Sequence, residues 1–132
     1  MRVKIDAATD PTNLLSAGGQ VIFKDNEQLQ ESRELTHGLN NNQAEFENLI
    51  ETLAFILDYY GGEELVFIET DNKTVNDIIA NDHTNNPDFK EYLAEFNELE
   101  RYFGTLIIKH IPEKENKQAD MLAKSRLEKM KK

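Results

Sequence analysis

The sequence contains no cysteine and no tryptophan, and only 3 prolines and 6 glycines in 132 residues. The lack of cysteine excludes disulfides, thiol nucleophiles and cysteine-based zinc sites. No stretch approaches the roughly 18 to 20 consecutive apolar residues of a membrane span, and no apolar signal segment follows the first charged residues. We therefore expect a cytoplasmic protein with no membrane partner. With 39% hydrophobic residues, the length fits a single domain over residues 1–132.

Positive charge is also scarce. The chain has 15 Lys and Arg against 25 Asp and Glu, which gives a net charge of −10. Such a balance argues against nucleic-acid binding by bulk electrostatics. Residues 109–132 are the exception, with 8 basic against 4 acidic side chains, whereas residues 1–108 hold 7 against 21. Two explanations of this basic end are possible. The lysines complement the dipole of a helix, or they bind a negatively charged substrate.

Hydrophobic periodicity and turn residues predict nine elements in the order β-β-β-α-β-α-α-β-α. The first helix is expected from about residue 42 to residue 60, since Phe46, Leu49, Ile50 and Leu53 share one face and Gly61 and Gly62 follow. Residues 27–38 are mixed in polarity and allow a helix or a strand, and the short turn at residue 26 favours the strand. Residues 64–70 contain four consecutive apolar side chains, which is typical of a strand buried on both faces. Antiparallel strands followed by βα alternation predict an α/β fold with a five-stranded mixed sheet and helices on both faces.

Four carboxylates stand where predicted elements begin or end. Asp6 ends the first strand and Asp71 follows the strand of residues 64–70, and parallel neighbours would place these two side by side. Glu45 and Asp120 fall in the first turns of two helices, where any single acid is common because of the helix dipole. Four clustered carboxylates would repel one another, however, so the set indicates bound cations.

The contexts of these acids make the set more specific. IDAATD, NNQAEFENL, IETDNKTV and HIPEKENKQADMLA occur in that order, and with them the chain resembles the type 1 ribonuclease H family from residue 1 to about 128. The resemblance implies a ribonuclease H-like fold and an endonuclease that hydrolyses the RNA strand of RNA/DNA hybrids. It also implies two Mg²⁺ or Mn²⁺ ions as cofactors, which would activate water and stabilise the leaving oxygen. Four side chains are then catalytic metal ligands, with Asp6 bridging both ions: Asp6, Glu45, Asp71 and Asp120.

A histidine completes the predicted catalytic set. His110 stands ten residues before Asp120, as the mobile loop histidine of the family does. An imidazole at this place resembles the group that assists proton transfer or product release. The alternative is a histidine at a strand end with no role.

The residues that contact the substrate in the family are matched less well in this sequence than the four carboxylates are. The family turn Gly-Asn-Pro-Gly after the first strand, which helps to hold a phosphate, is replaced here by DPTNLL, in which Thr12 or Asn13 could substitute. Solvated polar residues at helix starts are the alternative explanation for the remaining candidates. We expect four side chains to contact the substrate backbone: Asn13, Asn41, Asn72 and Lys73.

The basic helix and loop of larger bacterial members is missing, and the outward face of the helix after Pro87 carries Glu91, Glu95 and Glu98. We therefore expect a monomer that binds hybrids weakly, or whose substrate affinity comes from a protein partner. One alternative is a catalytically weak or inactive ribonuclease H-like module that binds nucleic acid or a protein. Another is a 3′–5′ exonuclease of the DEDD type, which would carry Asp-x-Glu where Asp6-Ala7-Ala8 stands.

Overall fold

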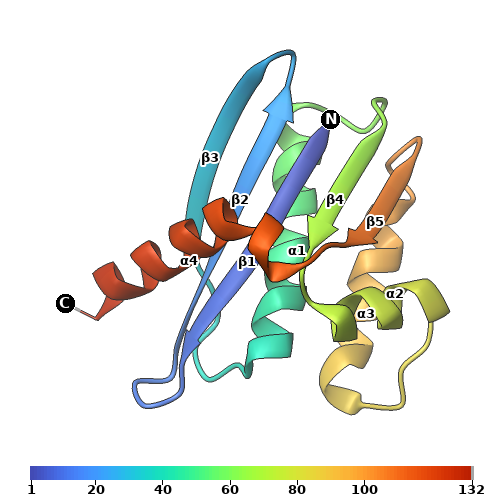
Figure 1. Cartoon of the computed structure of the whole chain (residues 1–132). Coiled ribbons are helices and arrows are strands. Elements are labelled where there is room, and N and C mark those ends of the chain that lie inside the picture. Colours follow the sequence, from blue (N-terminus) through green and yellow to red (C-terminus); the bar gives the residue numbers. More distant parts are fainter. Residues whose placement is uncertain (132) are drawn as a thin grey trace.

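Five strands form one mixed sheet in the computed structural model, which describes residues 1–131 (Figure 1). The strand order is β3-β2-β1-β4-β5. The pairs β1–β2 and β2–β3 are antiparallel, whereas β1–β4 and β4–β5 are parallel. The strands are β1 (Arg2–Asp10), β2 (Leu15–Lys24), β3 (Glu27–Glu34), β4 (Val66–Thr70) and β5 (Leu106–His110).

Helices cover both faces of this sheet. The helix α4 packs on β1, β2 and β3, and lies in front of them in Figure 1, whereas α1 lies behind the sheet and packs against α3. The predicted α/β class, element order and mixed sheet are confirmed. No helix within residues 1–131 is both long and apolar enough to cross a bilayer. The helices are α1 (Asn41–Tyr59), α2 (Lys73–Asn81), α3 (Pro87–Glu100) and α4 (Lys117–Met130), with a 3₁₀ turn, η1 (Glu113–Glu115), before α4.

Local signals define the ends of α1. Asn40 caps the helix, since its side chain accepts from the Gln43 N–H and the Gln43 side chain accepts from the Asn40 N–H. Gly61 follows the helix with a φ of +83°, a conformation that glycine adopts without strain. Because the cap is Asn40, Glu45 lies in the second turn. The expectation that it occupies the first turn was therefore wrong, and the helix dipole does not account for it.

The first strand is longer than the sequence suggested. We expected β1 to end near Asp6, but β1 continues to Asp10, which pairs with Leu15 of β2. Its parallel partner β4 stops earlier, because the last pair is Ile5 with Thr70. From Asp6 to Asp10, β1 therefore has a strand neighbour on one side only. We call this segment the free edge of β1.

The strand β4 is buried on one face only, which corrects the expectation of burial on both. Val66 and Ile68 are buried in the main core with α1, whereas Phe67 is 36% exposed. On the adjacent β5, Ile107 is 39% exposed. The reason is the placement of α4, which packs on β1, β2 and β3.

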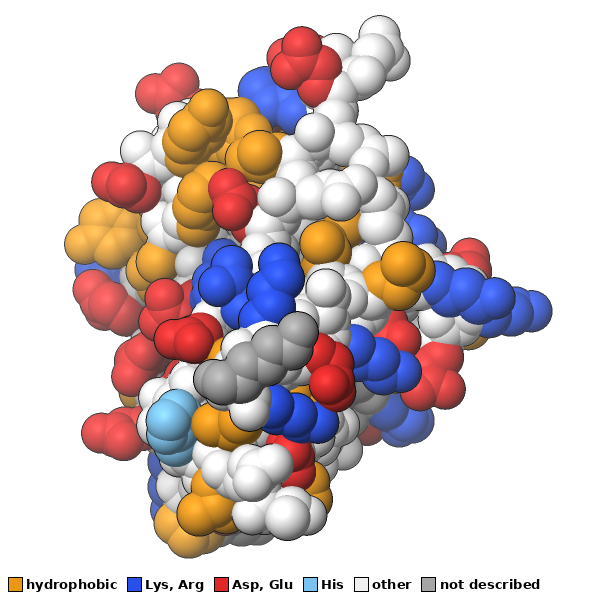
Figure 2. Space-filling model, turned by 90° about the vertical axis from the view of Figure 1, so that its left-hand side faces the viewer, with side chains coloured by type: hydrophobic (Ala, Val, Ile, Leu, Met, Phe, Trp, Pro, Cys, Tyr) orange, Lys and Arg blue, Asp and Glu red, His pale blue; other side chains and the backbone are white. Residues whose placement is uncertain are grey.

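The uneven charge of the sequence is visible on the surface. Figure 2 shows acidic side chains along the left edge of one face, and basic side chains interspersed with further acidic ones across its middle and right. Some of the basic side chains near the C-terminus are paired. Lys131 Nζ lies 3.0 Å from Glu128 Oε1 and 3.4 Å from Asp10 Oδ2, so part of that positive charge is neutralised within the fold.

Candidate metal centre

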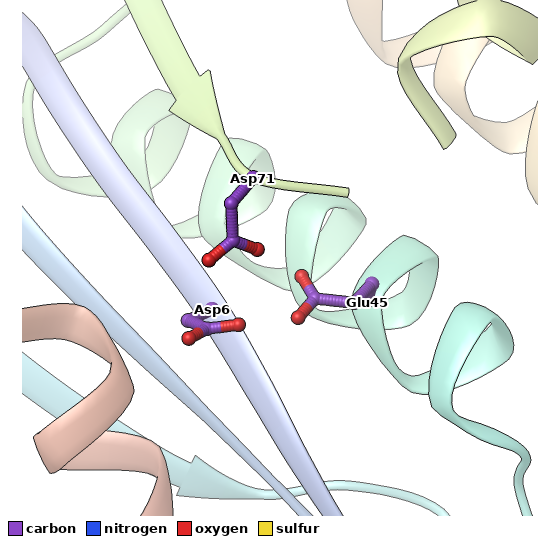
Figure 3. Close-up of side chains that lie close together, drawn as sticks. All are labelled: Asp6, Glu45 and Asp71. Atoms are coloured by element: carbon purple, nitrogen blue, oxygen red, sulfur yellow. The ribbon is translucent and has the colours of Figure 1, made fainter. Parts of the chain in front are cut away.

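Three carboxylates from different elements converge beside the free edge of β1 (Figure 3). Asp6 belongs to β1, Glu45 to α1, and Asp71 directly follows β4. One oxygen of each lies within 4.8 Å of the others. Since Ile5 pairs with Thr70 in the parallel ladder, the next residues of the two strands, Asp6 and Asp71, must be neighbours. The structure thus brings together three of the four predicted metal ligands.

Glu45 fills the place where β4 ends. Its Oε1 accepts a hydrogen bond of 2.7 Å from the N–H of Ala7, a residue of the free edge with no partner from β4. Its Oε2 is buried and has no hydrogen-bond partner within residues 1–131, and the residue is only 2% exposed. Burying a carboxylate oxygen without a partner lowers the free energy of unfolding, and a bound cation or a proton would offset this cost.

The protonation equilibria of the cluster agree with that requirement. Burial raises the pKa of Asp6 to about 6, and the charge of Asp71 adds to the rise. Burial, together with the adjacent Asp6, raises the pKa of Glu45 well above its usual range. Burial also raises the pKa of Asp71, against the opposing effect of the Asn116 amide. These groups therefore favour any positive charge that enters the cluster.

Asp120 lies at the edge of this cluster. It occupies the first turn of α4, as predicted, and lines the same cavity of about 370 Å³ as Asp6, Glu45 and Asp71. It is not among the three carboxylates that approach within 4.8 Å of one another. Its Oδ2 instead lies 3.0 Å from Lys124 Nζ, one helical turn further along α4.

Two of the predicted substrate contacts line the cavity, namely Asn41 and Asn72. Asn41 is exposed at the start of α1. Asn72 caps α2, since its Oδ1 accepts from the Val75 N–H at 2.8 Å, and its Nδ2 donates to Asn42 Oδ1 at 2.8 Å. Its amide is thus held rigidly at the cavity wall.

The other predicted contacts lie outside the lining of that cavity. Lys73 is exposed and pairs with Asp77, and Asn13 donates to the Asp10 carboxylate within the β1–β2 turn. His110 is the exposed last residue of β5. Positive charge on His110 works against the raised pKa of Asp71, which places the imidazole in electrostatic reach of the cluster.

Two buried asparagines that were not predicted as site residues hold the backbone of β1. Asn116 Nδ2 donates to the Ile5 carbonyl at 2.7 Å, and Asn48 Nδ2 donates to the Asp6 carbonyl at 2.9 Å. Both residues are fully buried. The available signal for Asn48 was a polar residue next to Leu49 on the apolar stripe of α1, since buried polar groups need partners.

Consecutive glycines allow both helices to approach the strands. A Cβ at Gly18 would lie 2.1 Å from Asn48 Oδ1 on α1, and a Cβ at Gly19 would lie 2.6 Å from the Ala119 carbonyl on α4. Successive residues of a strand point to opposite faces, so each glycine admits a different helix. The helices that carry Glu45 and Asp120 can therefore come close to β1 and β2.

The sheet order and the converging carboxylates define a protein with the ribonuclease H-like fold. The sequence matches the family model described as reverse transcriptase-like over residues 4–126, so the chain belongs to that family. It is 35% identical over 133 residues to an Enterococcus faecalis protein named "Putative hydrolase EbsB", and the match covers 98% of this chain and 95% of that protein.

Solved structures confirm the resemblance to type 1 ribonuclease H. RNase H1 from the halophilic archaeon Halobacterium salinarum superposes with a TM-score of 0.87 at 25% identity, over 97% of each chain. LC11-RNase H1 in complex with an RNA/DNA hybrid superposes with a TM-score of 0.88 at 20% identity, over 99% of each chain. The source of LC11-RNase H1 is compost, from which it was isolated by a metagenomic approach.

Proposed function

We propose that the protein is a ribonuclease H, an endonuclease that hydrolyses the RNA strand of RNA/DNA hybrids by a mechanism that uses two Mg²⁺ or Mn²⁺ ions. The observation that carries the proposal is the convergence of Asp6, Glu45 and Asp71 around a buried, unpartnered oxygen of Glu45. Solved structures of similar fold carry the name RNase H1, and one of them contains an RNA/DNA hybrid, which supports the same substrate here.

The side chains of the cluster fit hard divalent cations. Carboxylate oxygens are the ligands that Mg²⁺ prefers, and a cation would relieve both the mutual repulsion of the acids and the desolvation of Glu45. Asp6, Glu45 and Asp71 would hold the metal, and Asp120 would join them from α4. When bound, such ions activate a water nucleophile and stabilise the charge of the phosphoryl group in the transition state.

The protein itself would hold the reacting groups in place. Asp6 lies within a paired strand and Glu45 is fixed by its bond to the Ala7 N–H, so neither needs to reorganise during the reaction. We propose that His110, at the end of β5 and next to β4, transfers a proton to the leaving oxygen or assists product release. An imidazole has two ring nitrogens that can donate or accept a proton, so it can serve either role.

Polar side chains around the cavity would determine the substrate specificity. Asn41 and Asn72 line it with amides that can both donate and accept hydrogen bonds, and Lys73 and Asn13 lie further out. The 2′-hydroxyl groups exposed in the wide minor groove of the hybrid distinguish RNA from DNA. Each hydroxyl can donate a hydrogen bond to an amide oxygen or accept one from an amide N–H. We propose that Asn41 and Asn72 contact the nucleic-acid backbone there.

The test is cleavage of end-labelled RNA/DNA hybrid, duplex DNA and duplex RNA with Mg²⁺, Mn²⁺ or EDTA. We expect internal cuts in the RNA strand of the hybrid only, and none with EDTA. Asp71→Asn should abolish cleavage. Asp58→Asn, which removes an exposed charge from the far end of α1, is the matched control and should cleave normally. A product ladder from one end would instead identify an exonuclease.

One contact favours the second candidate, a catalytically weak or inactive module that binds nucleic acid or a protein. Lys124 Nζ lies 3.0 Å from Asp120 Oδ2 and so competes with a metal for the fourth carboxylate. The same assay separates the two candidates. Hybrid binding without cleavage, with either metal and over a wide range of enzyme concentration, would support the module and reject the nuclease.

A further inference from the structure

A polar network lies in the core between the sheet and α1, and the proposed chemistry does not use it. At its centre is Arg33 of β3, whose guanidinium reaches inward. Arg33 Nη1 donates to Asn48 Oδ1 at 2.6 Å and to Thr52 Oγ1 at 3.2 Å, and Nη2 donates to Gln20 Oε1. The three acceptor residues are fully buried. The network therefore links β3, β2 and α1 beneath the sheet.

The guanidinium decides which way the Asn48 amide points. Arginine has donors and no acceptor, so the oxygen of the amide must face Arg33. The Asn48 Nδ2 then faces two backbone carbonyls, that of Asp6 at 2.9 Å and that of Gly19 at 3.1 Å. Hydrogen bonds in such a chain polarise one another, so the Arg33 charge strengthens the donors of Asn48. The network ends on the backbone of a proposed metal ligand.

The network has no carboxylate partner. Within residues 1–131 Arg33 forms no ion pair with an acid. Burial lowers the pKa of its guanidinium, against the opposing charges of Glu51 and Glu31. Arg33 itself is half-buried, and replacing a charged group in the interior by an apolar side chain of similar volume is often neutral or stabilising. The backbone is also shaped for the network, since Gly18 leaves the space that Asn48 Oδ1 occupies. Stability alone gives little reason for this arrangement.

The position of the contact suggests another reason. Beyond Ile5, β1 has no parallel neighbour, so the backbone at Asp6 is held by β2 on one side only. Asn48 bonds to the Asp6 and Gly19 carbonyls, and these two residues pair across β1 and β2. It thereby fixes the strand at the point where support from β4 ends.

We infer that Asn48 and Arg33 are positioning residues, which hold the Asp6 backbone, and with it the Asp6 carboxylate, in the geometry that a divalent cation requires. This inference rests on the proposed metal-dependent function. It concerns side chains that touch neither the metal nor the substrate and act through Asp6 alone. Partners of this kind outside the ligand shell commonly change metal affinity or activity by about 10- to 100-fold when removed.

The test compares folded variants of the 132-residue chain by Mn²⁺ affinity, measured by electron paramagnetic resonance without substrate. Arg33→Met removes the donor that orients Asn48 and keeps a flexible apolar stem. Arg33→Lys restores a charge and a donor. Thr52→Val is the matched control, because it removes another acceptor of the same guanidinium and leaves the Asn48 contact in place.

We expect Arg33→Met to weaken Mn²⁺ binding about 10-fold, Arg33→Lys to recover most of the loss, and Thr52→Val to bind Mn²⁺ normally even where its thermal midpoint falls. Equal affinity in all variants would overturn the inference. So would an equal loss in Thr52→Val and Arg33→Met, because the effect would then follow general destabilisation of the core.

Two further measurements keep the test decisive if Arg33→Met does not fold. Asn48→Ala removes the amide donors directly and should weaken Mn²⁺ binding at least as much. In the unmodified protein, Mg²⁺ should slow hydrogen exchange of the Asn48 side-chain amide, since coupling between bound metal and support is reciprocal. Unchanged exchange would contradict the inference.

Absence of hybrid cleavage would reject the proposed nuclease but would leave these binding results interpretable.

Discussion

Replacing Asp6 by asparagine should stabilise the metal-free protein near neutral pH while abolishing hydrolysis. Burial raises the pKa of Asp6 to about 6, whereas an unfolded chain gives about 3.9. The native state therefore binds this proton more tightly than the unfolded state does. The stability from this difference is fully present below about pH 3.9 and is lost as the pH rises through about 6.

The size of the effect follows from the same difference. About two pKa units at 1.36 kcal/mol each amount to a loss of up to about 3 kcal/mol above pH 7. Asparagine is neutral and nearly isosteric, and its Oδ1 can still accept the 2.9 Å hydrogen bond from the Ala7 N–H. Asp6→Asn should therefore recover most of that loss, which corresponds to a rise of roughly 5 to 10 °C in Tm for a domain of this size.

The assay is thermal unfolding in EDTA, followed by circular dichroism, between about pH 4 and pH 8. The gain of Asp6→Asn over the unmodified protein should be largest at the highest pH and should vanish at the lowest. Asp10→Asn is the control on the same strand. The Asn13 amide lowers the pKa of Asp10, so this variant should lose stability near neutral pH. Mg²⁺ should raise the Tm of the unmodified protein more than that of Asp6→Asn, because binding favours the folded state.

Two results would refute this reasoning. A lower Tm for Asp6→Asn at high pH would mean that the carboxylate supports the fold and is not a strained metal ligand. A gain of the same size at all pH values would mean that the benefit does not come from removing a buried charge.

Two more predictions concern the lysines around the cluster. Lys124→Met removes the cation beside Asp120, so half-maximal cleavage should require less Mg²⁺ in a metal titration; a higher requirement would instead assign Lys124 to the substrate. Lys114 and Lys117 line the open side of the cluster with Glu113. Replacing both by glutamine should raise KM, leave kcat nearly unchanged and flatten the salt dependence of log affinity by roughly 1 to 2 units. An unchanged KM would point to an outside partner as the source of substrate affinity.

The local parts of this structure were predicted from sequence more completely than the parts that depend on contacts between distant segments. The apolar stripe of Phe46, Leu49 and Leu53 and the glycine at position 61 lie within α1 or next to it, so the helix was predicted nearly to its ends. The end of β1 depends instead on where β2 and β4 stop pairing with it. The exposed face of β4, at Phe67, depends on which strands α4 covers. Neither the end of β1 nor the exposed face of β4 can therefore be predicted from the residues of that strand alone.

The candidate site divides in the same way. The identity of Asp6, Glu45 and Asp71 followed from their contexts, and the parallel register explains the approach of two of them. The support behind them was not foreseen, because Arg33 and Asn48 meet only when β3 folds against α1. A basic residue in a strand of mixed polarity gives no signal that its guanidinium turns inward.

The site exists because β1 extends past β4. If β4 ran as far as β1, its backbone would occupy the edge that now leaves the Ala7 N–H free, and Glu45 would have no place to bind. Asp71 follows directly where β4 stops, so the same early end delivers the third acid. Gly18 and Gly19 then allow α1 and α4 to approach from opposite faces. Acids in the right sequence order would therefore not be enough. The free edge of β1 lets Asp6, Glu45 and Asp71 converge, and the two glycines let the helices of Glu45 and Asp120 approach.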